Sequence, residues 1–386
     1  MADYKVAVVT STRAEYGLLK PVIASLSDTD GINVMVVVTG AHLLASQGST
    51  ISEIRNDGTA IAACIDIYHG DASDEAAAVA NAVTGFAAWF RSERPDLVVL
   101  LGDRYEIFGV AAAASMCGIP IAHISGGETT EGAKDEFYRH CITKMSAIHF
   151  PSTERYRKRI IQLGERPSAV FNVGSLGAQN VLSVPLMDKD ALSASVGFDF
   201  SSSFLLCTCH PETLGSGADV CIPLLNAIDR LGIPVLFTAA NADAEGDIIN
   251  QRISEFCGTH PSCKLVQSLG YRRYLSALKL CSAVVGNSSS SLTEAPAMRK
   301  PSVNIGIRQL GRDMTDTVIS CPSDEGAIIS AVRTALSSEF RSVCENAVLP
   351  FRCEGVSSSI AEIVKRSLES GISCKKSFYD IDFEVR

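Results

Sequence analysis

The sequence predicts an α/β protein with two doubly wound domains, each a parallel sheet covered by helices on both faces. Short apolar, β-branched runs alternate with longer segments of helical spacing. The strand runs are continuously apolar, as is typical of strands buried on both faces. The alternation stops near residues 182–203 and then resumes, and 386 residues exceed the size at which one hydrophobic core usually keeps growing.

The first domain is expected to span residues 1–185. Its expected strands are the apolar runs at 4–10, 32–40, 96–102, 119–124 and 169–174. Helical spacing lies between them, at 15–27, 72–92, 104–117 and 133–148. Strands joined by helices of this length pair in parallel, because each helix carries the chain back across the sheet.

The second domain is expected to span residues 186–355, after a polar linker at 182–203. Its expected strands are 204–209, 233–240, 263–267, 282–286 and 301–306. A third segment, 356–386, holds a helix and a tail. We expect this helix to pack back on the first domain.

Composition excludes several classes of protein. The net charge of -9 and the pI near 5.4 provide no general basic field for nucleic acid, so an anionic ligand must be held by local groups. No apolar stretch reaches the roughly 18 residues of a membrane span, and the N-terminal residues lead directly into a strand without a signal-peptide pattern. A cytoplasmic location is the expectation.

The cysteines predict neither a disulfide framework nor a metal site. The 13 Cys are scattered singly through apolar surroundings, without the paired spacing of zinc ligands, and an odd count argues against complete pairing. We expect buried, reduced thiols, no metal and no cofactor.

Polar residues follow the ends of several predicted strands. The run LLGDRYEIFG sets Asp103, Arg104 and Glu106 directly after a buried strand. Other strand ends carry Arg13, Glu15, His42, His123, Ser125, Glu128, His210 and Glu212. Taken alone, each residue is about as often structural, as a solvated ion pair or a buried histidine, as it is part of a functional site. However, ligands bind beyond the carboxyl ends of parallel strands. Together with the strand end at GNSSSSLTEAP, six strand ends with the same character therefore predict a ligand site.

The strongest local pattern is VVGNSSSSLTEAPAMRKPSVNIG, residues 284–306. A strand ends at Gly286, and Asn287 with four serines is expected to open a helix. Free amides at a helix N-terminus, with the hydroxyls of Ser288, Ser289 and Ser290, suit a pyrophosphate. A serine N-cap with a glutamate on the helix is the ordinary alternative, although a run of four serines is uncommon for it.

Three further features of this half favour a nucleotide. Glu294 could accept both hydroxyls of a ribose diol. Arg308 and Arg312, on either side of the segment that holds Gln309, could neutralise phosphate, and Arg308 is favoured slightly. The backbone around Gly270 could read the base, whether uracil or guanine.

These residues resemble the hydrolysing UDP-N-acetylglucosamine 2-epimerases of sialic-acid and related nonulosonic-acid synthesis. The similar motifs run in the same order over essentially the whole length: TSTRAEYGLL, LLGDRYE, HISGGETTEGAKDEFYRHCITKMS, HPET and GNSSSS with EAP and NIGIRQLGR. The resemblance implies a two-domain GT-B fold with the domains facing across a cleft. It places the nucleotide on the C-terminal domain and the sugar against the N-terminal loops.

The resemblance also implies the chemistry. Nucleoside diphosphate leaves by anti elimination to a 2-acetamidoglycal, and water then adds with a proton delivered to the opposite face of C2. Both steps need carboxylates as acid and base. Departing diphosphate needs donors, for which Arg13, His210 and the amides of Ser288 to Ser290 are the candidates.

Asp103 and Asp135 match the acids of the family motifs and are the predicted acid/base pair. Asp135 lies on a segment that continues to Arg139 and His140. The segment TTEGAKDE is one residue longer than in some relatives, so Glu136 is the alternative to Asp135. Parts of the family carry an acid where this chain has Ser125. Glu128, next to Gly126 and Gly127, or Glu131 is expected to compensate.

The sequence leaves the substrate open between N-acetylglucosamine and a 2,4-diacetamido sugar on the way to legionaminic acid, and between UDP and GDP. A GT-B glycosyltransferase would share the nucleotide site but need an acceptor groove, and a nucleotide-sugar sensor would need no group of acids around the sugar. A homo-oligomer, dimer or tetramer, is expected.

Overall fold

The computed structural model describes residues 3–44, 50–69, 74–131, 133–212, 216–240, 245–382 and 384. The chain forms two compact units. The first comprises Met1–Glu128, Asp135–Gln179 and Phe351–Arg386, and the second comprises Thr129–Lys134 and Asn180–Pro350. The domain limits expected from the sequence are residues 185 and 355, with 129–134 in the first domain.

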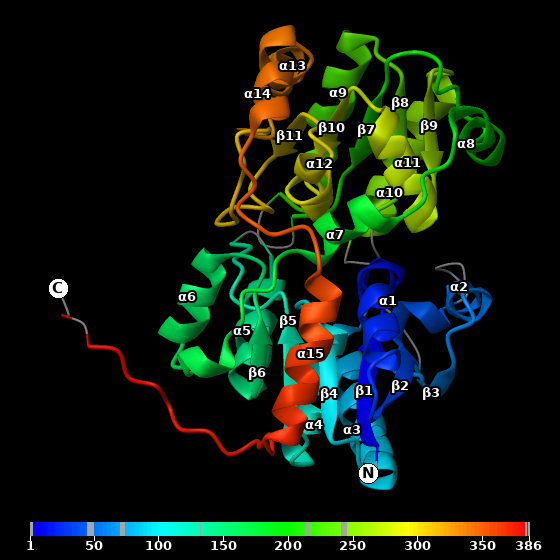
Figure 1. Ribbon diagram of the computed structural model, residues 1–386. Coiled ribbons are helices and arrows are strands. Elements are labelled where there is room, and N and C mark those ends of the chain that lie inside the picture. The colour runs from blue at the N-terminus through cyan, green and yellow to red at the C-terminus, as the bar shows by residue number, and fades with distance from the viewer. Residues whose placement is uncertain are drawn as a thin grey trace. The chain divides into compact units, whose positions relative to one another are not determined.

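The first unit contains a six-stranded parallel sheet (Figure 1). Its strands are β1 (Tyr4–Thr10), β2 (Ile32–Thr39), β3 (Ile61–Ile65), β4 (Leu97–Leu101), β5 (Ile121–Ile124) and β6 (Ile148–Phe150), in the order β3-β2-β1-β4-β5-β6. Its helices are α1 (Arg13–Ser27), α2 (Ile51–Asn56), α3 (Glu75–Glu93), α4 (Tyr105–Met116), α5 (Asp135–Met145), α6 (Glu154–Gln162) and α15 (Val356–Glu369), and α7 (Leu176–Ser183) spans the limit to the second unit. Short 3-10 turns are η1 (Gly40–Leu43) and η3 (Pro167–Ala169).

The second unit repeats this topology. Its strands are β7 (Leu205–Thr208), β8 (Val235–Thr238), β9 (Cys263–Val266), β10 (Ala283–Gly286), β11 (Ser302–Ile305) and β12 (Val318–Cys321), in the order β12-β11-β10-β7-β8-β9. Its helices are α8 (Lys189–Val196), α9 (Cys221–Leu231), α10 (Gly246–Thr259), α11 (Gly270–Leu280), α12 (Glu294–Ala297), α13 (Glu325–Ala335) and α14 (Ser338–Asn346), with 3-10 turns η4 (Ala218–Val220) and η5 (Ser289–Ser291). Counted from β7, the strands follow the same order as in the first sheet.

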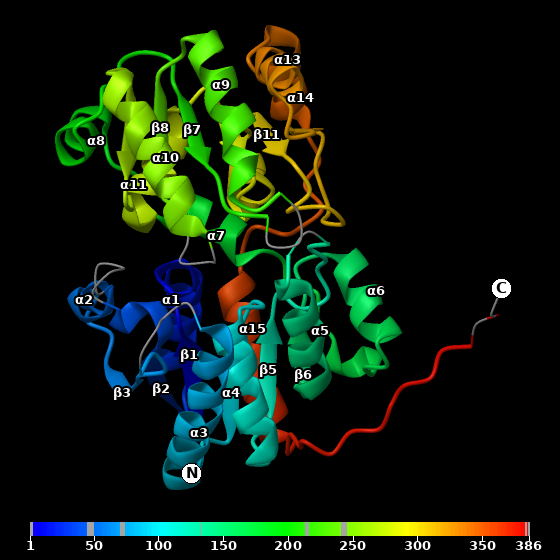
Figure 2. The same cartoon turned by 180° about the vertical axis from the view of Figure 1, so that it is seen from behind.

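Each sheet is buried on both faces, which explains its continuously apolar strands. In the first unit, α1 and α15 cover one face, and Figure 1 shows them side by side. The opposite face packs against α3 and α4, which lie in front in Figure 2. In the second unit, α9, α10 and α13 cover one face and α8, α11 and α12 the other.

The prediction of two parallel, doubly wound sheets is confirmed. The strand expected at 169–174 is wrong: only Val170 forms a bridge, to His149. The sixth strand is β6, at the end of a segment expected to be helical. It was missed because three residues, Ile148 to Phe150 with a histidine between them, are too few to show a strand pattern. Strands β3 and β12 were not expected, and the polar stretch 182–203 contains α8.

No helix within the described ranges is long and apolar enough to span a membrane.

Candidate active site

Both sheets reverse their strand order at one point, between β1 and β4 in the first unit and between β7 and β10 in the second. In open α/β sheets, loops diverge at this point and leave room for a ligand at the carboxyl ends of the strands. The predicted site residues fall into two groups at these points. We call the residues that follow β1, β4 and β5, together with α5, the first strand-end cluster, and those that follow β7, β10 and β11 the second strand-end cluster.

Asp103 lies directly after β4 and is held by Arg139 of α5. Its Oδ2 accepts hydrogen bonds from both Nε, at 3.0 Å, and Nη2 of Arg139. The Arg139 side chain is fully buried, whereas that of Asp103 is 26% exposed. A buried guanidinium paired with a partly exposed carboxylate fixes the carboxylate's orientation and leaves it accessible.

Arg139 also joins two other parts of the first cluster. Its Nη1 donates to the backbone oxygen of Glu128, at 3.1 Å, and to Oε2 of Glu136, at 2.7 Å. The other carboxylate oxygen of Glu136 lies 2.9 Å from Nε2 of His140. Sequence analysis named Glu136 only as an alternative to Asp135. The spacing of three residues to Arg139 and four to His140 on one helix could have shown its role.

Asp135 is the first residue of α5 and is partly exposed. Glu131 is exposed and belongs to the segment that groups with the second unit. In that unit its amide donates to the backbone oxygen of Leu310, at 3.1 Å. The acids predicted around this motif therefore lie in different surroundings, and Arg139 binds the carboxylates of Asp103 and Glu136 and the backbone of Glu128.

The turn after β5 brings the backbone close to α5 and α6. Ser125 adopts a positive φ of 64°, which is uncommon outside glycine, and its amide donates to the oxygen of Phe150 at 3.1 Å. A Cβ on Gly126 would lie 2.9 Å from Nδ1 of His123, and one on Gly127 would lie 2.5 Å from the oxygen of Tyr156. Only glycines fit this close approach.

Glu128 follows these glycines and is 8% exposed. Ser152 Oγ donates to its Oε1, at 3.4 Å. The carboxylate is thus nearly buried in the segment after β5, the strand that pairs in parallel with the β4 strand preceding Asp103.

Of the three binding histidines predicted in this unit, His42 and His123 are held by hydrogen bonds inside the fold. His123 is fully buried, with Nε2 2.7 Å from the oxygen of Gly102 and Nδ1 3.2 Å from Thr143 Oγ1. Both ring nitrogens of buried His42 also have partners, Thr10 and Thr50. Burial lowers the pKa of His123 to about 3 and that of His42 to about 4, so both rings are neutral near pH 7. His123 fixes the backbone that leads to Asp103.

Glu15 and Arg13 lie at the start of α1. The Glu15 carboxylate accepts from the amide of Ser11, at 2.7 Å, and from its hydroxyl, at 2.9 Å. Burial, with a contribution from the Glu106 carboxylate, raises the pKa of Glu15 to about 7. Arg13 is 28% exposed and lies 3.4 Å from Oε1 of Glu53.

Arg104 pairs with Glu106, whose side chain is fully buried, at 3.1 Å. Tyr68 donates to the same carboxylate, also at 3.1 Å. Two of the three charges in LLGDRYEIFG therefore stabilise the start of α4, and Asp103 is the one bound to Arg139.

In the second cluster, Asn287 joins the ends of β7 and β10. Its Oδ1 accepts from the amide of His210, at 2.7 Å, and its Nδ2 donates to the oxygen of His210, at 2.8 Å. A Cβ on Gly286, which has a φ of 134°, would collide with the oxygen of Thr208. Glycine and asparagine at these positions hold the two strand ends together, and His210 is 6% exposed.

The sequence predicts that the serines open one continuous helix, and this prediction is wrong. Ser289–Ser291 form the 3-10 turn η5, and α12 is a separate four-residue helix that begins at Glu294. Ser288 caps the turn, while Ser290 accepts a hydrogen bond from Tyr274 at 2.8 Å. A phosphate here would rely on amides and hydroxyls of a tight turn, because helices this short have a small dipole.

Glu294 is 9% exposed, and its Oε2 accepts from Thr293 Oγ1. Gln309 is fully buried and donates to the oxygen of Asn287, at 2.8 Å. Arg312 donates to Gln309 Oε1, at 3.3 Å, and Arg308 lies 3.5 Å from the oxygen of Asn287. Gln309 thus connects the loop of both arginines to the end of β10.

Glu212 positions the start of this loop. Its Oε1 accepts from the amide of Ile307, at 2.6 Å, and it is 4% exposed. A Cβ on Gly306 would collide with the same carboxylate oxygen. The sequence placed Glu212 at a strand end but gave no sign of a partner 95 residues away. Gly270, expected near the base, has a φ of 63° at the start of α11.

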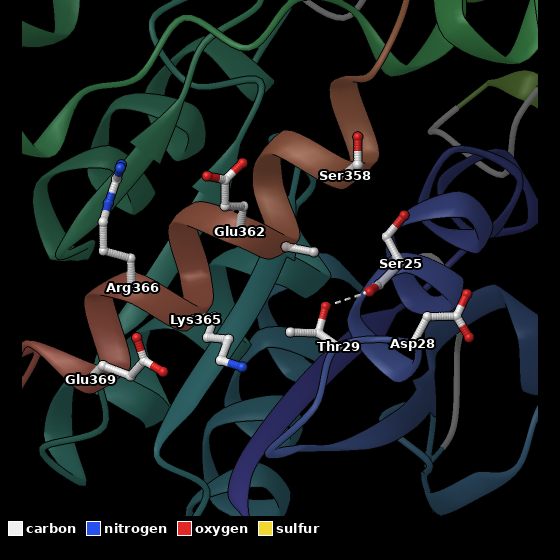
Figure 3. Close-up of a pocket in the computed structure, with 9 residues that line it drawn as sticks. Ser25, Asp28, Thr29, Ser358, Glu362, Lys365, Arg366 and Glu369 are labelled. Carbon is white, nitrogen blue, oxygen red and sulfur yellow. Dashed lines mark hydrogen bonds between the residues drawn. The ribbon is translucent and has the colours of Figure 1, made fainter.

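A groove of about 570 Å³ lies elsewhere on the first unit, between α1 and α15 (Figure 3). None of the predicted site residues lines it. In the part of the chain that the structure describes, no three His, Cys, Asp or Glu side chains gather to hold a metal ion.

Comparison with known proteins identifies the family. The family model described as UDP-N-acetylglucosamine 2-epimerase matches residues 24–365. "Polysialic acid biosynthesis protein P7" of Escherichia coli is 38% identical, over 98% of this chain and 97% of that protein. The chain belongs to the UDP-N-acetylglucosamine 2-epimerase family.

Within the UDP-N-acetylglucosamine 2-epimerase family, the chain belongs to the hydrolysing branch and is a nucleotide-sugar 2-epimerase. "GDP/UDP-N,N'-diacetylbacillosamine 2-epimerase (hydrolyzing)" of Campylobacter jejuni is 35% identical, over 88% of this chain and 90% of that protein. The fold is shared with the crystal structure of UDP-GlcNAc 2-epimerase from Neisseria meningitidis bound to UDP-GlcNAc, with a TM-score of 0.80 over 94% of this chain and 100% of that one, at 17% identity.

Proposed function

We propose that this protein converts UDP-N-acetylglucosamine to UDP and the free 2-epimer, an N-acetylmannosamine-type sugar, for nonulosonic-acid synthesis. The observation that carries the proposal is the pair formed by Asp103 and buried Arg139, with the Glu128 backbone bound to the same guanidinium. This arrangement supplies fixed carboxylates at a strand end, which a reaction that removes and returns a proton requires.

The first step is an elimination. The C2 proton of an intact sugar is not acidic, so its removal must be assisted by departure of the leaving group. A base takes the C2 proton, the electron pair forms the C1–C2 double bond, and the C1–O bond to the diphosphate breaks. Groups that bind the diphosphate more tightly as its charge develops accelerate this step.

The second step returns the proton. Water adds to C1 of the 2-acetamidoglycal and loses a proton to a base, while an acid delivers a proton to C2 on the face opposite to the one that lost it. Two carboxyl groups with different surroundings suit these opposite roles. Asp103 is partly exposed and paired with Arg139, whereas Glu128 is nearly buried beside Ser152.

We assign acid/base chemistry to Asp103 and Glu128, with Asp135 as the third acid and Glu131 as the alternative to Glu128. Diphosphate contacts are assigned to Arg13, His210, Arg308 and the turn at Ser288–Ser290, and ribose to Glu294. The clamp between Asn287 and His210 and the contact between Gln309 and Asn287 support this assignment, because they hold amides and cations of the second cluster in fixed positions.

The second candidate is the same reaction on UDP- or GDP-N,N'-diacetylbacillosamine. The Campylobacter relative named for that activity is 35% identical, and the Escherichia coli relative named for polysialic acid biosynthesis is 38% identical, so similarity to relatives favours neither candidate strongly. The two sugars differ at C4, where an acetamido group replaces a hydroxyl, and at C6, where the bacillosamine sugar lacks the hydroxyl.

A comparison of kcat/KM for UDP-N-acetylglucosamine, UDP-N,N'-diacetylbacillosamine and GDP-N,N'-diacetylbacillosamine decides between them. The first proposal predicts at least a tenfold preference for UDP-N-acetylglucosamine, about 1.4 kcal/mol, which is typical for one poorly accommodated group. A tenfold preference for either bacillosamine substrate assigns the protein to the second candidate. Turnover of none of the three contradicts both.

A further inference from the structure

The C-terminal tail contacts the first unit at a buried ionic cluster. Glu165, which follows α6, is 2% exposed and accepts from Lys144 of α5, at 2.6 Å, and from Lys376 of the tail, at 2.7 Å. His149 of β6 lies 3.2 Å from the same carboxylate. Burial alone would raise the pKa of Glu165, but the hydrogen bonds from His149, Lys144 and Lys376 lower it from the ordinary 4.5 to about 2. One residue therefore joins α5, β6 and the loop after α6 to the tail.

Neighbouring tail residues make further contacts with the same corner. Lys376 Nζ also donates to the oxygen of Ser146, at 2.7 Å, and Tyr379 donates its amide to the oxygen of Gly164, at 2.9 Å. The ring of Phe378 occupies the space into which a Cβ on Gly164 would project, and Lys144 Nζ lies 4.9 Å from that ring's centre. The tail is thus bound by ionic, backbone and ring contacts over four residues.

This corner supports the turn that leads to Glu128. The amide of Glu165 donates to the oxygen of Ile160, at 3.3 Å, and the Ile160 side chain lies against Gly127, 2.8 Å from where a Cβ would stand. Arg159 Nη1 donates to the oxygen of Gly127, at 2.6 Å. In addition, β6 accepts the Ser125 amide through Phe150, the residue after His149. Helix α6 and strand β6 both connect Glu165 to the turn.

We propose that Lys376 is a positioning residue and that the tail acts as a strap, which holds the Ser125–Glu128 turn in its working geometry through Glu165, α6 and β6. The catalytic part of this proposal rests on the proposed function. Removal of the Lys376 ammonium leaves the nearly buried Glu165 carboxylate with one fewer cation. Because a buried charge without enough partners is costly, we expect Glu165 and the residues next to it to move toward solvent. A displacement of a catalytic group by about 1 Å is enough to slow a reaction up to a hundredfold.

Full-length variants test the strap. Lys376→Met removes the charge at similar length, and Lys376→Arg retains it. Lys375→Met is the matched control, because Lys375 is exposed and donates its backbone amide, which the substitution retains, to Ser373 Oγ. We expect Lys376→Met to lower kcat about tenfold with KM for the nucleotide sugar changed less than twofold, Lys376→Arg to stay within about threefold, and the control to match the wild type. A lower kcat with a nearly unchanged KM indicates a positioning role. A loss of folded protein would instead lower the concentration of active enzyme, and active-site titration corrects for it.

Amide hydrogen exchange supplies a readout that needs no turnover. We expect faster exchange in Lys376→Met at Ser125 to Glu128 as well as in the tail, and unchanged exchange in Lys375→Met. If Lys376→Met does not fold, Tyr379→Pro tests the strap at a second contact, because it removes the amide that donates to Gly164 together with a side chain that is 40% exposed. Faster exchange confined to the tail overturns the strap, as does a wild-type kcat. Failure of the proposed function alone would leave the exchange result at Ser125 to Glu128 intact.

Discussion

Asp103 and Arg139 form an ion pair in which a fully buried guanidinium holds a carboxylate that is 26% exposed. The two residues lie 36 positions apart, one after β4 and one in α5. Because Arg139 also contacts Glu128 and Glu136, a single buried side chain organises three acidic residues.

Asp103→Asn tests the acid/base assignment of this carboxylate. The amide oxygen can still accept from Arg139, so the fold is retained, but the proton-transferring group is lost. We expect kcat to fall at least about a hundredfold, with UDP affinity changed by less than about threefold. Steady-state kinetics and calorimetry measure both. Asp190→Asn, at an exposed position of α8, is the control and should behave as the wild type.

Glu128→Gln tests the acid expected to replace the one missing at Ser125. The amide retains the size and one acceptor of the carboxylate, so we expect turnover to fall at least about a hundredfold without a large loss of thermal stability. Ser125→Ala is the matched control. It keeps the positive φ and the backbone bond to Phe150 and should retain turnover within a few-fold.

The alternative is that Glu128 only stabilises the turn. In that case Glu128→Gln keeps its rate, and Glu131→Gln or Asp135→Asn is the inactive variant. A synthetic 2-acetamidoglycal separates the steps, because a variant that hydrates the glycal but releases no nucleotide from the intact substrate has lost only elimination.

Glu294→Ala tests the ribose assignment in the second unit. Loss of a hydrogen-bonded charged group is expected to weaken UDP binding by about 1 to 3 kcal/mol and to raise KM accordingly, with kcat little changed. Calorimetry with UDP measures the loss. Glu345→Ala, at an exposed position of α14, is the control. Unchanged UDP affinity in Glu294→Ala removes Glu294 from the nucleotide site.

Glu15 predicts a pH-dependent stability of the first unit. Its pKa of about 7 in the folded state lies above the ordinary value of 4.5, so folding favours the protonated acid. The resulting stabilisation relative to Glu15→Gln is fully present below pH 4.5 and is lost as the pH rises through 7. The expected loss is about 3 kcal/mol at most, from 1.36 kcal/mol per unit of pKa.

Urea unfolding of both proteins at pH 4.5 and pH 8 measures this difference. Trp89, the single tryptophan, lies in α3 and reports unfolding of the first unit by fluorescence. A difference between wild type and Glu15→Gln that stays constant over this range contradicts the raised pKa.

The sequence predicted the sheets well because local patterns determine them. Continuously apolar runs such as Leu97–Leu101, bounded by polar residues and glycine, are typical of buried strands, and glycines such as Gly286 mark places where backbones approach closely. Short or half-polar strands, such as Val318–Cys321, lack that pattern and were missed. The serine run looked like a helix start because serines cap both α-helices and 3-10 turns.

Partnerships between distant residues could not be predicted in the same way. Asp103 was recognised by its place in a motif, but its bond to Arg139 depends on how α5 packs against the sheet. Glu165 and Lys376 are separated by 211 residues, and neither lies in a motif. Buried charges such as Glu165 become visible only when burial is known, since on the sequence they read as surface residues.

Proton NMR of the purified protein with UDP-N-acetylglucosamine in heavy water tests the proposed elimination and hydration most directly. Elimination followed by hydration yields free 2-epimerised sugar with deuterium at C2, together with UDP, because elimination removes the C2 proton and hydration returns one from solvent. Free sugar without deuterium at C2 would contradict the elimination mechanism. UDP-activated N-acetylmannosamine as the product would contradict the assignment to the hydrolysing reaction.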